Sequence, residues 1–167
     1  YSVLENAGVR NISIDLIFGL PQLSDQQWKE TLERALDISE RGMPPHHISS
    51  YQLSVEPGSM LARLVEKGRF EEASEELCER QYAVLCETLA TAGYRHYEIS
   101  NFCKDKKHSR HNLKYWTMCN YVGFGLGASS FEDNRRYTHT ADFDKYIEGY
   151  DLCEDYVMDN KELMSEF

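Results

Sequence analysis

A strand, a helix and a second strand in immediate succession constrain the fold more than any other feature of the sequence. Apolar and polar residues alternate over residues 11–16 and again over residues 50–55, and each run leads into a turn that contains proline. Between them, Ser24 and Gln27 have the spacing of a helix capping box, and apolar residues then recur at helical intervals as far as Gly42. Strands joined by a helix in this way almost always become parallel, right-handed neighbours in one sheet. The sequence therefore predicts an α/β fold.

The polar positions of the two strands are candidates for ligand binding. If the apolar set of each strand packs on helices, Ser13 and Asp15 share the opposite face with Gln52 and Ser54. An ordinary barrel interior is filled by branched apolar side chains, whereas these four residues offer hydroxyl groups and acceptors near the C-terminal strand ends, where barrel ligands bind. For Asp15, a structural carboxylate that caps the following turn is an equally good interpretation.

Further elements follow this unit along the chain. A short helix is predicted over residues 59–67 and a longer one over residues 71–92, whose apolar side includes Cys78 as a small core residue. Residues 94–102 have the pattern of one more strand, and the pattern beyond Asp142 is helical. These elements follow one another without an internal repeat or a low-complexity linker.

Composition and charge limit the classes of function. A chain of 167 residues can bury one core, and its 41% hydrophobic and 28% charged residues are typical of a soluble globular domain. The net charge of −10 argues against a sequence-independent nucleic-acid binder, because neutralising phosphates needs clustered lysine and arginine. The sequence has neither an apolar run long enough to span a bilayer nor a signal-peptide pattern, so we expect an intracellular protein. Since the chain starts at Tyr1 without methionine, we also expect it to be part of a longer protein.

The cysteines do not form a recognisable framework. The five cysteines are odd in number and contain no Cys-x-x-Cys pair, which favours reduced thiols. Cys103, His108, His111 and Cys119 have the donor atoms of a zinc site, but their spacing is not that of common structural zinc sites. Scattered reduced cysteines are therefore the favoured interpretation, and a small zinc-binding module stays an alternative. No residue is assigned as a metal ligand.

The glycine-rich residues 123–128 match a loose dinucleotide-binding fingerprint. The context argues against a nucleotide fold, because few strand-like residues precede the glycines and the charged residues 132–136 follow in place of an apolar helix. Alternate glycines on a strand, which allow close approach of backbone or ligand, are the better interpretation.

Five segments in this order carry a resemblance to a known family. They are residues 11–21 (NISIDLIFGLP), 48–58 (ISSYQLSVEPG), 97–102 (YEISNF), 111–116 (HNLKYW) and 123–131 (GFGLGASSF). Together, over about residues 9–150, they resemble the radical S-adenosylmethionine proteins related to oxygen-independent coproporphyrinogen III oxidase. The His-Asn-x-x-Tyr-Trp segment is more similar to the haem-chaperone branch of that family, called HemW, than to the true oxidases.

The resemblance implies a fold and two cofactors. The fold is a partial triosephosphate-isomerase-type barrel, (βα)6, which in the full-length protein holds S-adenosylmethionine and a [4Fe–4S] cluster. The family's three cluster cysteines, spaced Cys-x-x-x-Cys-x-x-Cys, are absent from this sequence, and Gln22-Leu23 stands where the family usually has Gly-Gln. We expect residues 1–93 to be the C-terminal part of the barrel with its last two parallel strands, residues 94–150 a β-containing extension on the haem side, and residues 151–167 the start of a further helical module.

The resemblance also implies cofactor-binding residues. By motif, Asp15, Ser54 and Ser129 align with positions that contact S-adenosylmethionine in the family. The alternation of the strands independently selects Asp15 and Ser54, and it adds Gln52.

The resemblance implies a second group of residues, which would lie near the porphyrin site. This group consists of His111, Asn112, Tyr115 and Trp116. An imidazole can ligate haem iron, and aromatic faces suit a flat macrocycle. A packed histidine and a packed indole are the alternative for His111 and Trp116. No residue of the chain is assigned a catalytic role.

Three functions remain open. The first is a haem-binding chaperone that delivers haem to acceptor proteins, and the second is an oxidase that decarboxylates porphyrinogen propionates in haem biosynthesis. The third is a fold fragment without activity of its own, because the cluster cysteines are absent. The His-Asn-x-x-Tyr-Trp segment favours the chaperone, located in the cytoplasm or, in a eukaryote, in the mitochondrion.

Overall fold

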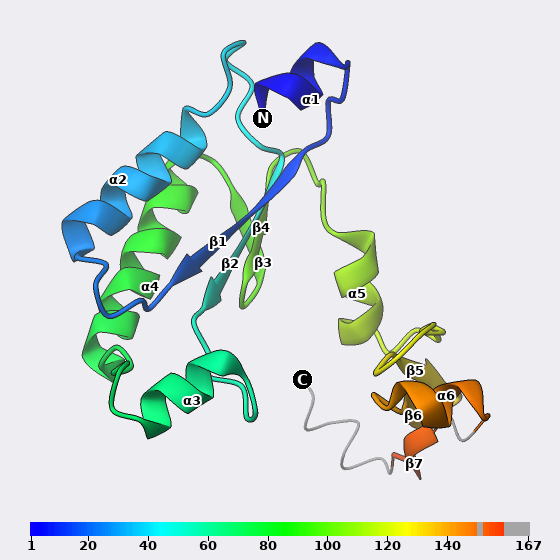
Figure 1. Ribbon diagram of the computed structural model, residues 1–167. Helices are drawn as coiled ribbons and strands as arrows, with labels where there is room; N and C mark the ends of the chain where they lie inside the picture. The colour runs from blue at the N-terminus through cyan, green and yellow to red at the C-terminus, as the bar shows by residue number, and fades with distance from the viewer. Residues whose placement is uncertain (150–151, 159–167) are drawn as a thin grey trace. The chain divides into compact units, whose positions relative to one another are not determined.

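The computed structural model describes residues 1–149 and 152–158, which form two compact units (Figure 1). The first unit comprises residues 1–108, and the second begins at Ser109. The elements of the first unit are α1 (Ser2–Asn6), β1 (Ser13–Phe18), α2 (Asp25–Leu36), β2 (His47–Gln52), α3 (Met60–Glu66), α4 (Glu75–Thr91), β3 (Arg95–Glu98) and β4 (Asn101–Cys103).

The predicted strand–helix–strand unit is confirmed. β1 and β2 are parallel neighbours, and their register runs from the pair Ser13 and His47 to the pair Phe18 and Gln52. The four-stranded sheet has the order β1-β2-β4-β3, in which β4 is antiparallel to both of its neighbours. β1 therefore forms one edge of this sheet.

Residues 94–102 fold as parts of a hairpin, where the sequence predicted a single strand. β3 ends at Glu98, and β4 begins at Asn101. The side-chain amide of Asn101 donates a hydrogen bond to the Glu98 carboxylate across the turn. The period-two pattern continues through both strands, so it does not mark the reversal. The pairing of β4 with β2 stabilises the hairpin, and a local pattern does not contain that contact.

α2 starts as predicted and ends earlier. The Ser24 hydroxyl accepts a hydrogen bond from the Gln27 backbone N–H at 3.2 Å, and the Gln27 side chain accepts one from the Ser24 backbone N–H at 3.0 Å. The helix ends at Leu36, before the expected stop at Gly42. The Ser39 hydroxyl accepts hydrogen bonds from the backbone N–H groups of Arg41 and Met43, and these bonds hold the chain in a turn.

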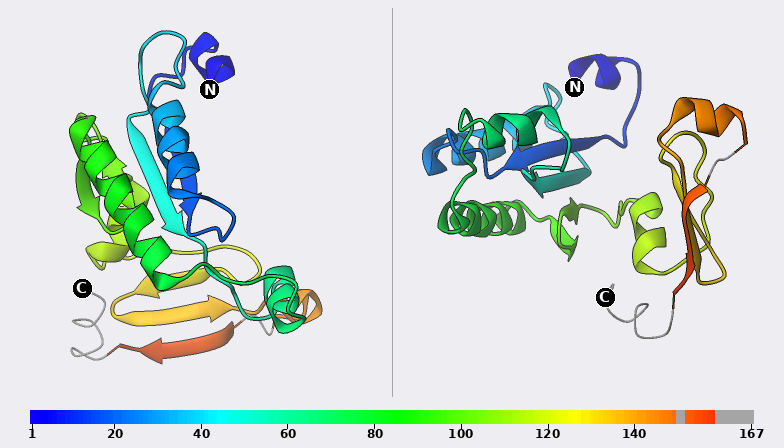
Figure 2. Two further views of the ribbon diagram at one scale, coloured as in Figure 1. Left: turned by 90° about the vertical axis from the view of Figure 1, so that its left-hand side faces the viewer. Right: turned by 60° about the horizontal axis from the view of Figure 1, so that its bottom comes forward.

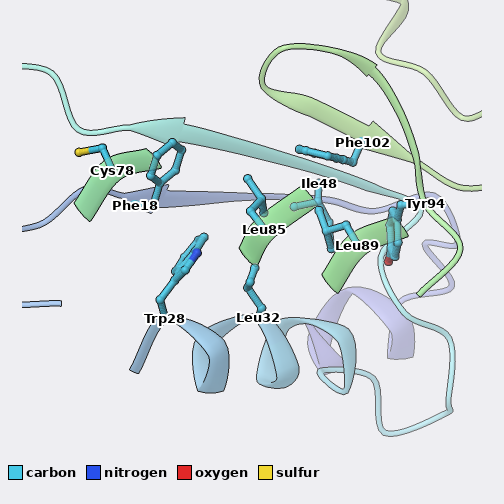
Figure 3. Packing of buried hydrophobic residues seen from close by; sticks show 9 residues of the cluster. All are labelled: Phe18, Trp28, Leu32, Ile48, Cys78, Leu85, Leu89, Tyr94 and Phe102. Atoms are coloured by element: carbon cyan, nitrogen blue, oxygen red, sulfur yellow. The ribbon is translucent and has the colours of Figure 1, made fainter. Parts of the chain in front are cut away.

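The core lies between the sheet and the helices α2 and α4 (Figure 3). Trp28 and Leu32 of α2 face Leu85 and Leu89 of α4, and all four are fully buried. Cys78 is buried beside Phe18 at one end of this layer, so its predicted role as a core residue is confirmed. The longer helix begins with Ser74 as its N-cap, later than the predicted residue 71.

Gln81 ties α4 to the loop that follows β1. It is fully buried, its side-chain oxygen accepts from the Gly19 backbone N–H at 2.8 Å, and its side-chain nitrogen donates to the Leu23 carbonyl at 2.8 Å. The Trp28 indole N–H donates to the Gln81 carbonyl at 2.9 Å. These bonds fix the turn at the C-terminal end of β1.

The second unit is built around an antiparallel sheet. Its described elements are α5 (Arg110–Trp116), β5 (Ser129–Glu132), β6 (Arg135–His139), α6 (Phe143–Ile147) and β7 (Leu152–Val157). The strands follow the order β5-β6-β7, seen as three adjacent arrows in the left view of Figure 2. The guanidinium of Arg135 on β6 forms an ion pair with Asp155 on β7 at 2.6 Å.

The expected helical structure is absent from residues 152–157. The helical pattern beyond Asp142 gives only the short helix α6, and residues 152–157 form the strand β7 because they pair with β6, where a helical module was expected. The rest of the expected module, residues 151 and 159–167, lies outside the described residues. The compact units divide between His108 and Ser109, because β4 completes the first sheet beyond the expected boundary at residues 93 and 94. The assignment of residues 1–93 to a barrel stays a prediction.

Candidate functional site

Asp15 lies on the face of the sheet opposite α2, as predicted. Ile14, Leu16 and Phe18 alternate with it along β1 and pack on the core of helices α2 and α4. Asp15 is exposed, and its partner in the parallel register is Ser49 of β2. We call the face that carries Asp15 the second face of the sheet.

The expected face of Gln52 was wrong, and Ser54 lies outside the strand. Gln52 is paired with Phe18 across the parallel register, so it lies on the helix-covered face. Ser54 lies after the end of β2, is exposed, and donates a hydrogen bond to Glu56 at 2.9 Å. The prediction set the alternation from Tyr51, Leu53 and Val55. Tyr51 lies in the strand but is 42% exposed and has the parity opposite to the core residue Ile48, and the other two lie in the loop after the strand.

His47 is the most highly connected polar residue of the second face. It is 5% exposed, and its two ring nitrogens lie 2.8 Å from the Ser13 hydroxyl and 2.7 Å from the Tyr97 hydroxyl. The Tyr97 ring in turn packs edge-on against His108, with centroids 4.7 Å apart. The hairpin and β1 thus hold one imidazole between two hydroxyl groups.

The electrostatic surroundings of His47 are mixed. Burial lowers the pKa of its imidazole below 6.5, and the nearby His108 acts in the same direction. The carboxylates of Asp15 and Glu98 act on this pKa in the opposite direction, because they favour the charged imidazolium. Burial is the largest of these effects, so the neutral form of His47 is favoured near neutral pH.

The second face also contains an acceptor without a partner. Asn101 is 2% exposed and is paired with Ser49 in the antiparallel register, so the two residues share this face. Its side-chain oxygen is buried and has no hydrogen-bond partner among the described residues. Together with the Asp15 carboxylate, it could accept hydrogen bonds from the hydroxyl or ammonium groups of S-adenosylmethionine. These groups fit such a ligand.

Ser129 and the glycine-rich segment belong to the second unit. Ser129 opens β5, is half-buried, and its hydroxyl lies 3.0 Å from that of Thr138. The expected strand over the glycines was wrong, because residues 122–127 form a loop. Close approach is found at Gly123, where an added Cβ would collide with the carbonyl oxygen of Ser129.

The helix α5 presents His111 and Tyr115 one turn apart on its surface. The Tyr115 hydroxyl lies 2.8 Å from the Nε2 atom of His111, and the two rings meet edge-on at 5.2 Å. Tyr115 also packs edge-on against Tyr121 at 4.8 Å, and Tyr121 stacks on Phe131 at 6.3 Å. His111 therefore lies at one end of a row of aromatic rings.

The other two residues of the segment lie on a neighbouring side of α5. Asn112 is half-buried, and Trp116 is 36% exposed. A small cavity of about 140 Å³ beside Tyr115 and Lys114 is lined by Tyr121, Phe131 and other residues of the second unit. This volume is below the roughly 300–1,000 Å³ of typical small-molecule sites, so a macrocycle would have to bind on the surface of this unit.

The thiols do not fit an iron–sulfur cluster. Cys78, Cys86 and Cys103 belong to the first unit, whereas Cys119 and Cys153 are exposed in the second. Within residues 1–149 and 152–158, no group of three or more His, Cys, Asp or Glu side chains gathers in a metal-binding arrangement. The geometry of the described residues therefore supports neither the four-ligand zinc site nor an iron–sulfur cluster.

Sequence reasoning missed several residues of these clusters. His47 and Tyr97 on the second face and Tyr121 and Phe131 in the aromatic row were not selected. His47 could have been found from the strand alternation, because it has the parity opposite to the core residue Ile48. The aromatic row depends on contacts between α5, a loop and β5, so no local spacing predicts it.

Comparison with known proteins relates the chain to one family. It is 34% identical over 141 residues to "Heme chaperone HemW" of Bacillus subtilis, a match that covers 84% of this chain and 36% of that protein. It is 36% identical over 117 residues to "Radical S-adenosyl methionine domain-containing protein 1, mitochondrial" of Danio rerio, covering 70% of this chain and 25% of that protein. The chain thus spans about a third or less of the length of these relatives. No family model matches it.

A solved structure shares the fold. Coproporphyrinogen III oxidase (HemN) from Escherichia coli, described as a radical SAM enzyme, matches with a TM-score of 0.71 over 97% of this chain and 40% of that one. The sequence identity is 14%, so the match concerns the fold alone. In the described part of the chain, no helix is both long and apolar enough to cross a membrane.

Proposed function

Because this chain belongs to the HemW- and HemN-like family of radical S-adenosylmethionine proteins, we propose that it is the C-terminal part of a haem chaperone. In this proposal β1 and β2 are the last two parallel strands of a six-stranded partial barrel. The free edge of β1 is where the strands of the missing part of the barrel would pair. The chaperone would deliver haem to acceptor proteins in the cytoplasm or, in a eukaryote, in the mitochondrion.

The family implies S-adenosylmethionine and a [4Fe–4S] cluster in the full-length protein. When bound together, they supply radical chemistry. We assign Asp15, Ser54 and Ser129 to the cofactor side, as the motifs predict, and add Asn101, whose buried side-chain oxygen has no partner. In this proposal these residues bind and orient S-adenosylmethionine. The three cysteines that ligate the cluster come from outside this chain.

The observation that carries the haem proposal is the pairing of His111 with an aromatic row. The imidazole is exposed, and Tyr115 holds its Nε2 atom by a hydrogen bond of 2.8 Å. An exposed imidazole beside Tyr115 and Tyr121 offers an axial nitrogen and flat apolar faces for a macrocycle. Haem would then replace the Tyr115 hydroxyl as the partner of His111.

Haemin titration of the chain tests this role. We expect His111→Ala to shift the Soret band and to weaken haemin binding by about tenfold, which corresponds to ~1.4 kcal/mol, because an axial nitrogen is lost. His111→Gln should shift the band in the same way, although glutamine can still bond to the Tyr115 hydroxyl. Tyr115→Phe should leave the axial ligand in place, because it frees the nitrogen without removing the imidazole.

Two controls separate ligation from folding. His139→Ala should leave the Soret band unchanged, since His139 packs edge-on against Tyr146 in a different part of the unit. Thermal melts of every variant report stability independently of haem. If His111→Ala lowers the melting temperature and leaves the Soret position unaltered, His111 is structural and the ligand role is wrong.

The oxidase and the inactive fragment are the competing functions. Oxidation of porphyrinogen propionates by the full-length protein, reconstituted with its cluster, would favour the oxidase. A chain that binds neither haemin nor S-adenosylmethionine while folded would favour the inactive fragment.

A further inference from the structure

A cleft of about 640 Å³ opens on the helix-covered face of the first sheet. Its walls come from β2, from the first turns of α4 and from the turn between β3 and β4. It lies entirely within the first unit, on the opposite side of the sheet from Asp15. Its volume falls within the range of about 300–1,000 Å³ that is typical of small-molecule sites.

Ser50 lines this cleft with a hydroxyl group that lacks a partner. The residue is 1% exposed, and its Oγ atom makes no hydrogen bond within the part of the chain that the structure describes. It has the same strand parity as Ile48, which packs in the core beneath α4, so its side chain points to the cleft side of the sheet. A buried hydroxyl without a partner is unfavourable, and a ligand that reached the floor of the cleft would supply one.

The mouth of the cleft is acidic. Glu75 and Glu79 lie one turn apart on the same side of α4, and both carboxylates are exposed. The cleft-lining residues within the described chain include no lysine or arginine, and the nearby Arg80 is paired with Asp25 at 3.1 Å. The charge of Glu75 adds to burial in raising the pKa of the Cys78 thiol in the cleft wall. The two carboxylates are therefore available to a cation.

The inner wall of the cleft is apolar and aromatic. The rings of Phe18 and Tyr82 lie 5.9 Å apart, and Ile99 contributes an exposed aliphatic side chain from the hairpin turn. Such a wall suits a short hydrocarbon stem. The Tyr82 face can also attract a positive charge.

We propose that this cleft binds a primary alkylammonium group, with the charge held by Glu75 and Glu79 and the stem against Phe18 and Tyr82. The Ser50 hydroxyl hydrogen-bonds to a polar group of the ligand at the floor. This orientation selects a free small amine, because a lysine side chain carried by a peptide would enter the cleft with its ammonium group first and could not keep that group at the mouth. None of the residues kept for S-adenosylmethionine and haem lines the cleft, and Gln52, which the alternation had added to the cofactor set, lines it instead. The proposal therefore does not depend on the proposed function.

Titration of the chain with n-butylammonium, followed by amide NMR spectra at physiological salt, tests the proposal. We expect shifts at cleft residues such as Ser50 and Ile99, and we expect the neutral isostere n-butanol to bind about tenfold more weakly. Nα-acetyl-lysine N-methylamide, whose ammonium group can enter only ahead of its amides, should bind more weakly than n-butylammonium. Equally tight binding would contradict the assigned orientation.

A matched pair of double variants isolates the carboxylates. Glu75→Gln with Glu79→Gln should weaken n-butylammonium binding about tenfold. Glu71→Gln with Glu72→Gln removes the same two charges from exposed residues that precede α4 and lie outside the cleft lining, so it should leave binding unchanged. Equal losses in both double variants, or n-butanol binding as tight as that of n-butylammonium, would overturn the proposal.

The Ser50→Ala variant tests the floor of the cleft. Because the hydroxyl has no partner in the described chain, its removal should leave the urea midpoint unchanged or raise it. It should also weaken binding of 4-hydroxybutylammonium, which carries a hydroxyl at the end of the same four-carbon stem, more than binding of n-butylammonium. A loss of stability without this selective effect would show that the hydroxyl serves the fold, and the assigned contact would be wrong.

Discussion

At the scale of single residues, His47 links the sheet, the hairpin and the pH dependence of stability. Its imidazole is held between the hydroxyl groups of Ser13 and Tyr97 at 2.8 and 2.7 Å, and it is 5% exposed. A protonated imidazole at this position would have to be desolvated. The carboxylates of Asp15 and Glu98 offset this desolvation only in part, because burial is the larger effect on the pKa of His47.

This arrangement predicts that folding stability falls with falling pH below about 6.5. The pKa of His47 is lowered in the folded chain, so between that lowered value and 6.5 the unfolded chain binds more protons. His47 thus contributes stability that is fully present above 6.5 and is lost as the pH falls through the folded pKa. Urea midpoints measured between pH 5 and 7.5 should show a slope of up to about 1.4 kcal/mol per pH unit from this group. His47→Gln should flatten it.

A tyrosine variant provides the control for His47. Tyr97→Phe removes one hydrogen bond to the imidazole but keeps the imidazole and its burial. It should therefore lower stability at every pH while the pH slope persists. A slope that survives unchanged in His47→Gln would assign the pH dependence to other groups, and the explanation would be wrong.

The predicted faces of Asp15 and Gln52 show where side-chain alternation can be used to place a residue. Asp15 was placed on the correct face because its neighbours Ile14 and Leu16 lie within β1 and alternate strictly. Gln52 was placed on the wrong face because the alternation was read from Tyr51, an exposed aromatic residue of the strand, and from loop residues beyond the strand end. Side-chain parity is reliable only inside the strand, and the sequence does not mark where β2 ends.

At the scale of secondary-structure elements, local signals predicted the starts of α2 and α3. The capping box at Ser24 and the short helix capped by Ser59 depend on contacts within one turn, which the sequence contains. The hairpin of β3 and β4 and the strand β7 depend on partners far along the chain, on β2 and β6 respectively. Those elements were mispredicted because tertiary pairing overrides local pattern.

The glycine loop before β5 gives a prediction at this scale. A Cβ on Gly123 would collide with the Ser129 carbonyl oxygen, and Ala128 would be in close contact at 3.1 Å. Gly123→Ala should therefore displace the loop from β5 and destabilise the second unit by about 2 kcal/mol or more, as overpacking does. Urea denaturation followed by near-ultraviolet circular dichroism of the aromatic row measures the loss.

Gly127→Ala is the matched control in the same loop. Gly127 has a φ of +68° and open space around the position of a Cβ, so alanine there should cost only the strain of the left-handed conformation, roughly 1 kcal/mol. A larger loss in Gly127→Ala than in Gly123→Ala would contradict the collision as the cause.

At the scale of the whole molecule, the described strands of the first unit form an open sheet. The first sheet has only one parallel pair among its described strands, and β1 is left at its edge. The curated relatives extend far beyond the length of this chain. The resemblance predicted the family, which the comparisons confirm, whereas the partial barrel stays a proposal.

The last prediction is that this chain alone does not assemble an iron–sulfur cluster. Cluster iron needs several thiolates held close together. Cys78 packs in the helix-side core, whereas Cys103 pairs with His47 and so lies on the opposite face of the same sheet. Burial raises the pKa of both thiols, which further disfavours the thiolates that bind iron.

Anaerobic reconstitution with iron and sulfide, followed by absorbance and by counting of bound iron, measures this outcome. We expect less than stoichiometric iron on the folded chain and no charge-transfer band, with the far-ultraviolet circular dichroism unchanged. The full-length protein, which should supply the three-cysteine loop, is the positive control and should bind a cluster under the same conditions. Stoichiometric iron and sulfide on the folded chain would mean that the cluster ligands lie within these residues, and the division between this chain and the cluster-binding part would have to be redrawn.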